Sequence, residues 1–266
     1  MRDDNAKAAP GRSSPVNTRL NRTHECSALQ SVRHLGHCSL HAVDGEVGVV
    51  KGLFFDEKNW AVRYLLVDTG GWLDGRRVLI SPVAVGEVRS EEQTIFVELT
   101  RPEIETSPPL DPDQPLSRRY EEAYYRHYDW PFYWNEDRQF GVTLAQTVPQ
   151  EGRLQRTSRV EECVIVTAEG AIGTVRGIFV DIRYWVIRYL DVVTRGDLHC
   201  RHLLVSTSWI ERVNWTDRIM KIDLACVAMD TAPAFDANRG INRDYVVELF
   251  SHYGRRGYWQ RNDGMN

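Results

Sequence analysis

Residues 44–82 read DGEVGVVKGLFFDEKNWAVRYLLVDTGGWLDGRRVLISP, and the same pattern recurs further along the chain. A shift of 125 positions (170 − 45) superimposes the two copies without a gap. A repeat of this length describes a whole domain, so it predicts two related domains within the 266 residues. The recurring positions, for which we expect structural roles, are Gly45, Gly48, Gly52, Asp56, Trp60, Arg63 and Tyr64 in the first copy and Gly170, Gly173, Gly177, Asp181, Trp185, Arg188 and Tyr189 in the second.

The hydrophobic pattern of the repeat is typical of β-strands. Residues 47–55 and 60–67 are rich in β-branched and aromatic residues and flank a polar turn, which predicts a hairpin. A second hairpin is expected to lead into 77–81, with short strands near 83–88 and 94–99. Gly48 and Gly52 interrupt the first strand. Because both recur in the second copy, we expect them at corners where the chain bends to close a small barrel.

The motifs of the repeat resemble those of the PRC-barrel family. They are a Gly-x-x-Gly opening, a Trp-x-x-Arg-Tyr-Leu strand and, in the first copy, a Gly-Arg-Arg-Val-Leu-Ile-Ser-Pro segment. The second copy has Cys200, Arg201 and His202 in place of Gly-Arg-Arg, and Thr207 in place of the proline. The family's small β-barrel occurs in the cytoplasmic part of the photosynthetic reaction centre H subunit and in a ribosome maturation factor. The resemblance implies two tandem barrels, and it implies a fold rather than an activity.

Each barrel is followed by a helix and an aromatic tail. Residues 101–115 are rich in proline and predict an extended connector. Ser117 then has the character of a helix cap, and Tyr120, Tyr124 and Tyr128 fall on one helical face. The same sequence of features begins again at Asn242. Two packings stay open: each helix and tail covers its own barrel, or each docks on the other unit and generates a pseudo-twofold molecule.

The predicted fold is dominated by β-structure, with two tandem small PRC-like barrels, each followed by a short helix and tail, in a pseudo-twofold arrangement. The expected divisions are a disordered N-terminal arm at 1–30, a first barrel with helix and tail at 31–140, a linker at 141–158, and a second barrel with helix and tail at 159–266.

The composition is that of a globular cytoplasmic protein. Hydrophobic residues make up 42% and charged residues 26% of the chain. The formal net charge of −4 gives no strong field for recruiting a polyanion, so nucleic-acid binding is disfavoured. The five cysteines have no regular spacing and predict no disulfide framework. No apolar run approaches the ~20 residues that a spanning helix needs, so we expect no membrane insertion.

The histidines and cysteines form two clusters that could bind a metal. The first comprises His24, Cys26, His34, His37, Cys38 and His41. We interpret Cys38 as a small buried residue, because it recurs as Cys163 without neighbouring histidines. The second comprises His199, Cys200 and His202, but alternation along a strand places its two histidines on opposite faces. We therefore predict no metal site and no cofactor.

We expect structural roles for the polar residues of the repeat. Asp56 opens a hairpin turn and is expected to accept hydrogen bonds from the turn's own backbone, whereas Asp68 becomes Val193 in the second copy. Arg63 and Arg188 lie in mid-strand and are expected to pair with a carboxylate. The sequence has none of the common catalytic motifs, so we predict that the protein is not an enzyme.

The family resemblance implies association with a protein partner or assembly through the barrel surface, and self-association is also open. The loop at 70–76 and its flank supply the candidate contact residues Trp72, Arg76 and Arg77, although Trp72 could equally fold back on the barrel. Two alternative functions are kept. One is an RNA- or ribosome-associated factor, and the other is a metal-binding or redox protein that uses the histidine and cysteine clusters.

Overall fold

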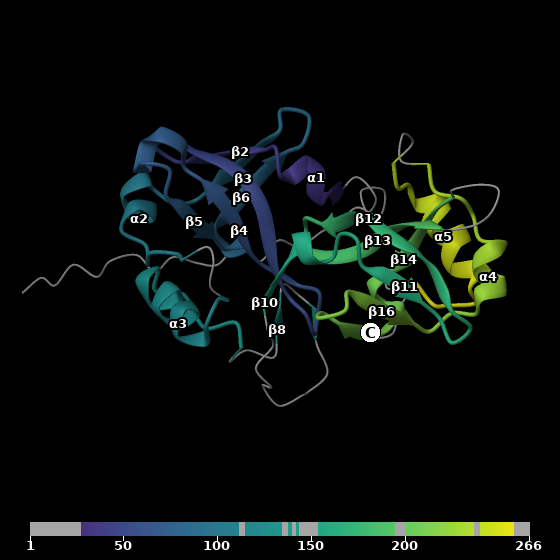
Figure 1. Cartoon of the computed structure of the whole chain (residues 1–266). Helices are drawn as coiled ribbons and strands as arrows, with labels where there is room; N and C mark the ends of the chain where they lie inside the picture. The colour runs from purple at the N-terminus through teal and green to yellow at the C-terminus, as the bar shows by residue number, and fades with distance from the viewer. Residues whose placement is uncertain are drawn as a thin grey trace, which may run out of the picture.

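The chain forms a mostly β structure with two large sheets, shown side by side in Figure 1. The computed structural model describes residues 28–111, 115–134, 138–139, 142–143, 154–194, 201–236 and 240–257. Each large sheet has seven strands, and a third sheet pairs only β8 (Arg138–Gln139) with β9 (Val142–Thr143).

The first sheet has the strand order β5-β4-β3-β2-β7-β6. All neighbours are antiparallel except β2 and β7, which run parallel. Bulges interrupt β3 between Val50 and Gly52 and again between Phe54 and Phe55, so the long strand bends. The strands are β2 (Ser39–Ala42), β3 (Gly45–Asp56), β4 (Val62–Asp68), β5 (Arg77–Ile80), β6 (Val85–Arg89) and β7 (Thr94–Val97), with 3-10 turns η1 (Gly70–Leu73) and η2 (Pro82–Ala84).

The second sheet follows the same order, β14-β13-β12-β11-β16-β15, again with one parallel pair. Its long strand β12 is bulged between Val175 and Gly177, at the same offset as the bulge in β3. The strands are β11 (Val164–Val166), β12 (Ala171–Asp181), β13 (Val186–Thr194), β14 (His202–Ser206), β15 (Ile210–Asn214) and β16 (Ile219–Ile222), with 3-10 turns η3 (Thr157–Arg159) and η4 (Thr207–Trp209).

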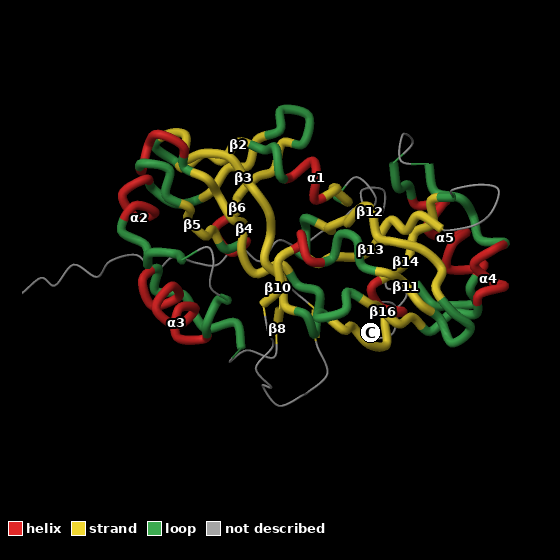
Figure 2. The backbone as a smooth tube through the Cα atoms, viewed as in Figure 1, coloured by secondary structure: helices red, strands yellow, loops and turns green. Residues whose placement is uncertain are grey.

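Two helices lie at the outer side of each sheet (Figure 2). The first half has α2 (Arg101–Glu105) and α3 (Arg118–His127), and the second has α4 (Cys226–Asp230) and α5 (Arg243–His252). The caps that begin the longer helices are Ser117, which accepts from the amide of Tyr120, and Asn242, which accepts from the amide of Tyr245.

The connector predicted as extended over 101–115 begins with a helix instead. Thr100 and Glu103 form a reciprocal capping box at the start of α2, and Pro102 lies in its first turn, where a missing amide hydrogen costs nothing. Burial of Ile104 then fixes the short helix against the sheet. The prolines therefore favour a helix start here as well as an extended chain.

Within the residues that the structure describes, the helices α3 and α5 and the first aromatic tail pack on the sheet of their own half. Tyr124 of α3 meets Tyr64 of β4 edge to face, with ring centroids 5.1 Å apart. In the second half Phe250 of α5 contacts Trp209, with centroids 5.1 Å apart. The second tail, at Tyr258 and Trp259, lies outside the described residues.

The two halves exchange their first strands. Strand β1 (Leu29–Ser31) pairs with β12 of the second sheet, and β10 (Leu154–Arg156) pairs with β3 of the first. The registers are equivalent, because Leu29 faces Asp181 just as Leu154 faces Asp56. A segment that we predicted as linker, 141–158, thus ends in an ordered strand and the start of η3.

An isolated bridge joins Ala61 to Val186, its own counterpart in the repeat. A residue that meets its own equivalent lies at a twofold axis, so the exchange and this bridge give the halves an approximate twofold relation. The exchanged strands, rather than the helical tails, produce that relation.

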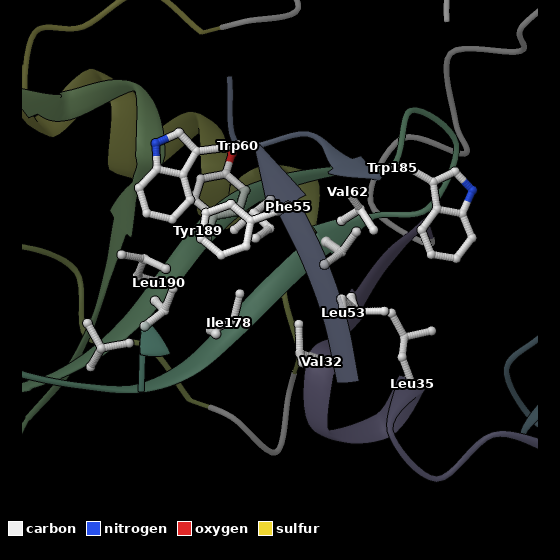
Figure 3. Close-up of a cluster of buried hydrophobic side chains, with 14 of the residues drawn as sticks. Val32, Leu35, Leu53, Phe55, Trp60, Val62, Ile178, Trp185, Tyr189 and Leu190 are labelled. Carbon is white, nitrogen blue, oxygen red and sulfur yellow. The ribbon is translucent and has the colours of Figure 1, made fainter. Parts of the chain in front are cut away.

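One hydrophobic cluster spans both halves. It begins at α1 (Val32–Leu35) in the first half and includes Leu249 and Phe250 of α5 in the second. Figure 3 shows Trp60 beside Tyr189 at one side of this cluster and Trp185 near Val62 at the other. The halves therefore share this core.

Candidate functional site

The hairpin that carries Trp72, Arg76 and Arg77 is the surface that the sequence favours for partner contact. Arg76 donates to the carbonyls of Glu105 and Ser107, at 2.8 and 2.6 Å, and so holds the end of α2. Trp72 is half-buried beneath the guanidinium of Arg101, which lies 4.4 Å from the ring centroid. Trp72 and Arg76 therefore have internal partners.

Arg77 differs from these two residues. It is exposed at the start of β5, opposite Asp68, and makes no ion pair with any residue that the structure describes. Of the three candidate contact residues, Arg77 alone presents its charge to solvent.

The described histidines and cysteines of the two clusters do not converge. Within the described part of the chain, no group of three or more histidine, cysteine or acidic side chains could hold a metal ion. His34 contacts the carbonyl of Ser90, and His202 pairs with Asp191 at 2.9 Å. Cys38 is buried, and burial raises the pKa of its thiol. Residues that fall outside the described ranges are His24, Cys26, His199 and Cys200.

The aspartates and arginines of the repeat make contacts that stabilise the fold. Asp56 accepts a hydrogen bond from the amide of Lys58 at 2.9 Å and pairs with Arg63 at 3.1 Å. Asp181 likewise accepts from the amide of Arg183 at 3.1 Å. These carboxylates close their hairpin turns and hold the neighbouring arginines.

A buried polar cluster in the first half was not apparent from the sequence. Glu121 of α3, with 3% of its side chain exposed, accepts from the hydroxyl of Tyr133 at 2.6 Å. Arg63 stacks on the ring of Tyr133 at 3.7 Å, and Arg118 lies 3.5 Å from Glu121. Burial raises the pKa of Glu121 in spite of these donors. The cluster fastens the aromatic tail to its helix.

A cavity of about 300 Å³ lies where the two halves meet. The elements that surround it are α1 with the turn after it, the middle of β3, β4 at Leu66, and the β10–η3 segment with the turn after it. Its apolar surface comes from side chains such as Leu53 and Leu66, and Arg156 lies over the ring of Phe54 at 5.0 Å. This is a candidate binding site for a small molecule.

The sequence reasoning missed this cavity because its residues come from four separate segments. Arg33, Lys51 and Arg156 are brought together only by the exchange of β1 and β10. A comparison of the repeats offered one clue, since Arg156 corresponds to the uncharged Ser31.

Residues 41–103 match the family model of the PRC-barrel domain. The match runs from β2 into α2 and so covers the first sheet apart from the exchanged strand β10. No curated protein matches the chain. Within the described ranges, no helix combines the length and the apolar character that crossing a membrane requires.

Proposed function

We propose that the chain contains two PRC-like units, the second of which follows the first at the 125-residue offset (170 − 45). The shared strand order of the two sheets supports this. Equivalent side chains also make equivalent contacts. Arg201 donates to the carbonyls of Asp230 and Ala232, as Arg76 does to those of Glu105 and Ser107.

The hydroxyls of Tyr120 and Tyr245 provide a second such pair. They reach the carbonyls of Pro108 and Pro233, both at 3.1 Å. These contacts tie the connector to the helix in each half. Their residues lie outside the segment that matches the family model, so they support the second unit by a separate observation.

We infer that the protein is a non-catalytic cytoplasmic binding or scaffold protein that contacts a protein partner. The supporting observation is the exchange of β1 and β10 around a shared core. It fixes two similar units in one relation, and the equivalent strands β5 and β14 are two parts that a partner can contact. Arg77 in one hairpin corresponds to His202 in the other, so the two parts offer different chemistry to a partner.

The partner contact is proposed to centre on Arg77 rather than on Trp72 or Arg76. Replacing Arg76 would release two carbonyls at the end of α2 and alter the fold together with the surface. Charge reversal at Arg77 changes only an exposed side chain. An acidic partner surface would lose affinity through repulsion as well as through a lost attraction.

The test is affinity capture from native lysate with the full chain, Arg77→Glu and the matched control Arg212→Glu, which reverses an exposed arginine on β15 of the second half. We expect a protein that binds the wild type and the control directly, as purified components, and binds Arg77→Glu at least about tenfold more weakly. A captured protein that binds all three forms equally, or no captured protein at all, contradicts the proposal.

Two further measurements distinguish the two alternative functions. Capture that is abolished by ribonuclease and falls steeply with salt would identify an RNA-associated factor. Stoichiometric metal in the purified chain by elemental analysis would instead favour a metal-binding or redox protein.

A further inference from the structure

The cavity between the halves carries an excess of positive charge. Arg33, Lys51 and Arg156 contribute three permanent cations, and Glu161 is the one carboxylate in the described lining. His37 also lines the cavity. Arg33, Lys51 and Glu161 form no ion pair with any described residue, so their charges are available to a ligand.

The cavity also has an apolar wall with a fixed orientation. The ring of Phe54 supports the guanidinium of Arg156 at 5.0 Å, which limits the movement of that long side chain. Thr157 is buried and accepts a hydrogen bond from the amide of Leu53 at 3.3 Å, which holds the β10–η3 segment against β3. The stacked Arg156 and the β10–η3 segment are therefore preformed parts of the cavity wall.

The second half does not repeat this chemistry. The positions equivalent to Leu66 and His37 are the acidic Asp191 and Glu162. Arg33 and Arg156 correspond to Ser158 and Ser31, and only Lys51 has a cationic equivalent, Arg176. A basic lining that served only the fold would be expected at both equivalent places. The excess of positive charge is found on one side only, which indicates a role in binding.

We propose that this cavity binds a small organic phosphate, namely a phosphate monoester with a compact apolar or aromatic body. Three cations around one opening suit a ligand with two negative charges better than a ligand with a single carboxylate. Guanidinium groups also suit phosphate oxygens as hydrogen-bond acceptors. The volume of about 300 Å³ restricts the ligand to a small molecule. The site does not depend on the proposed partner surface at Arg77, which lies on β5 and is absent from the cavity lining.

The test uses the full-length, ¹⁵N-labelled protein and three probes: phenyl phosphate, inorganic phosphate and phenol. We expect phenyl phosphate to give saturable shifts of the amide signals of Gly36, Gly52 and Ser158, which line the cavity. Inorganic phosphate, which lacks the ring, and phenol, which lacks the charge, should each bind at least about fivefold more weakly. Added salt should weaken binding of phenyl phosphate.

Substitutions give both a loss and a gain. Arg33→Gln and Lys51→Gln should each weaken phenyl phosphate binding about threefold to tenfold, whereas Glu161→Gln should tighten it about twofold to fivefold. All three side chains are exposed, so the fold should be retained. Lys58→Gln and Arg212→Gln remove exposed cations that lie outside the lining and should leave the affinity unchanged.

The gain at Glu161 separates binding from general damage, since a misfolded variant cannot bind more tightly. The proposal is overturned if phenyl phosphate gives no saturable shift at concentrations up to about 10 mM. It is also overturned if phenol or inorganic phosphate binds as tightly as phenyl phosphate, or if the Arg33, Lys51 and Glu161 variants match the controls.

Discussion

Gly48 allows the long strand β3 to pass close to the end of β4. A Cβ atom at this position would lie 2.0 Å from the carbonyl oxygen of Asp68, and one at Gly173 would lie 2.3 Å from that of Val193. Backbone atoms cannot move aside as the end of a side chain can. The repeated glycine is thus explained by the approach of two backbones at a bend of the sheet.

Gly48→Ala should therefore lower the free energy of unfolding by about 2–4 kcal/mol. The matched control is Gly71→Ala in η1, where no atom lies within 4 Å of the added Cβ and the change should be under about 1 kcal/mol. Urea unfolding of the two variants beside the wild type measures both. Equal stability of the two variants would show that the close approach at Gly48 is not present.

Glu121 should make stability depend on pH. Its pKa is raised in the folded protein, chiefly by burial, so the folded state holds this proton more tightly than the unfolded state. The stability that comes from the protonated carboxyl is complete below the unfolded pKa and is lost as the pH rises through the folded pKa. The wild type should therefore lose stability relative to Glu121→Gln as the pH rises across that window.

Urea unfolding of the wild type and Glu121→Gln at a series of pH values from about 4 to about 8 measures this difference. The second half supplies a natural contrast, because Val246 replaces the glutamate there. A difference between the two proteins that stays constant over the whole series would mean that Glu121 has an ordinary pKa.

Among the elements, α3 closes the edge of β5 with a single hydroxyl. The hydroxyl of Tyr124 accepts from the amide of Ser81 at 3.0 Å and donates to the carbonyl of Leu79 at 3.1 Å, and all three groups are buried. These are strand groups that would otherwise lie unpaired at a sheet edge. The helix therefore completes the hydrogen bonding of the sheet and also covers its apolar surface.

Tyr124→Phe should cost about 1–3 kcal/mol of stability, because it leaves a buried donor and a buried acceptor without a partner. Tyr120→Phe is the matched control on the same helix, since its hydroxyl reaches only the partly buried carbonyl of Pro108. In thermal unfolding, the Tyr124 variant should have a lower midpoint temperature than the Tyr120 variant. The reverse order would contradict the role given to Tyr124.

The helices and hairpins could be predicted from the sequence because each has a local cause. Ser117 and Asn242 are strong caps, and the tyrosines of α3 repeat at helical spacing. The start of α2 was predicted wrongly as extended chain, because proline is compatible with both conformations and the pairing of Thr100 with Glu103 decides between them.

The exchanged strands and the cavity between the halves had no such local cause. Strands β1 and β10 have three residues each and show no periodicity from which their pairing partner could be predicted. Their pairing depends on which edge the other half leaves open, and that is a property of the assembled sheets. The internal role of Arg76 was similarly hidden, although its recurrence as Arg201 was a usable clue.

At the scale of the whole molecule, the turns at Trp60 and Trp185 each form a backbone hydrogen bond with the opposite half. Trp60 and Trp185 both have positive φ, 57° and 51°, which is costly for large side chains. Their carbonyls accept from the amides of Ile187 and Val62, at 2.8 and 2.6 Å, across the approximate twofold axis. The strained turns are therefore stabilised by contact with the opposite half.

An engineered disulfide between positions 61 and 186 tests the contact between the two halves most directly. Ala61 and Val186 face each other between these two hydrogen bonds, a non-hydrogen-bonded pair whose Cα atoms are typically about 4.5 Å apart. That separation suits a disulfide. Ala61→Cys/Val186→Cys should form an intramolecular cross-link under mild oxidation, identified in the monomer by peptide mass spectrometry. The control Ala61→Cys/Val227→Cys, with its second site exposed on α4, should not. Absence of the 61–186 link, or equal linking in the control, would contradict the reciprocal arrangement of the two halves.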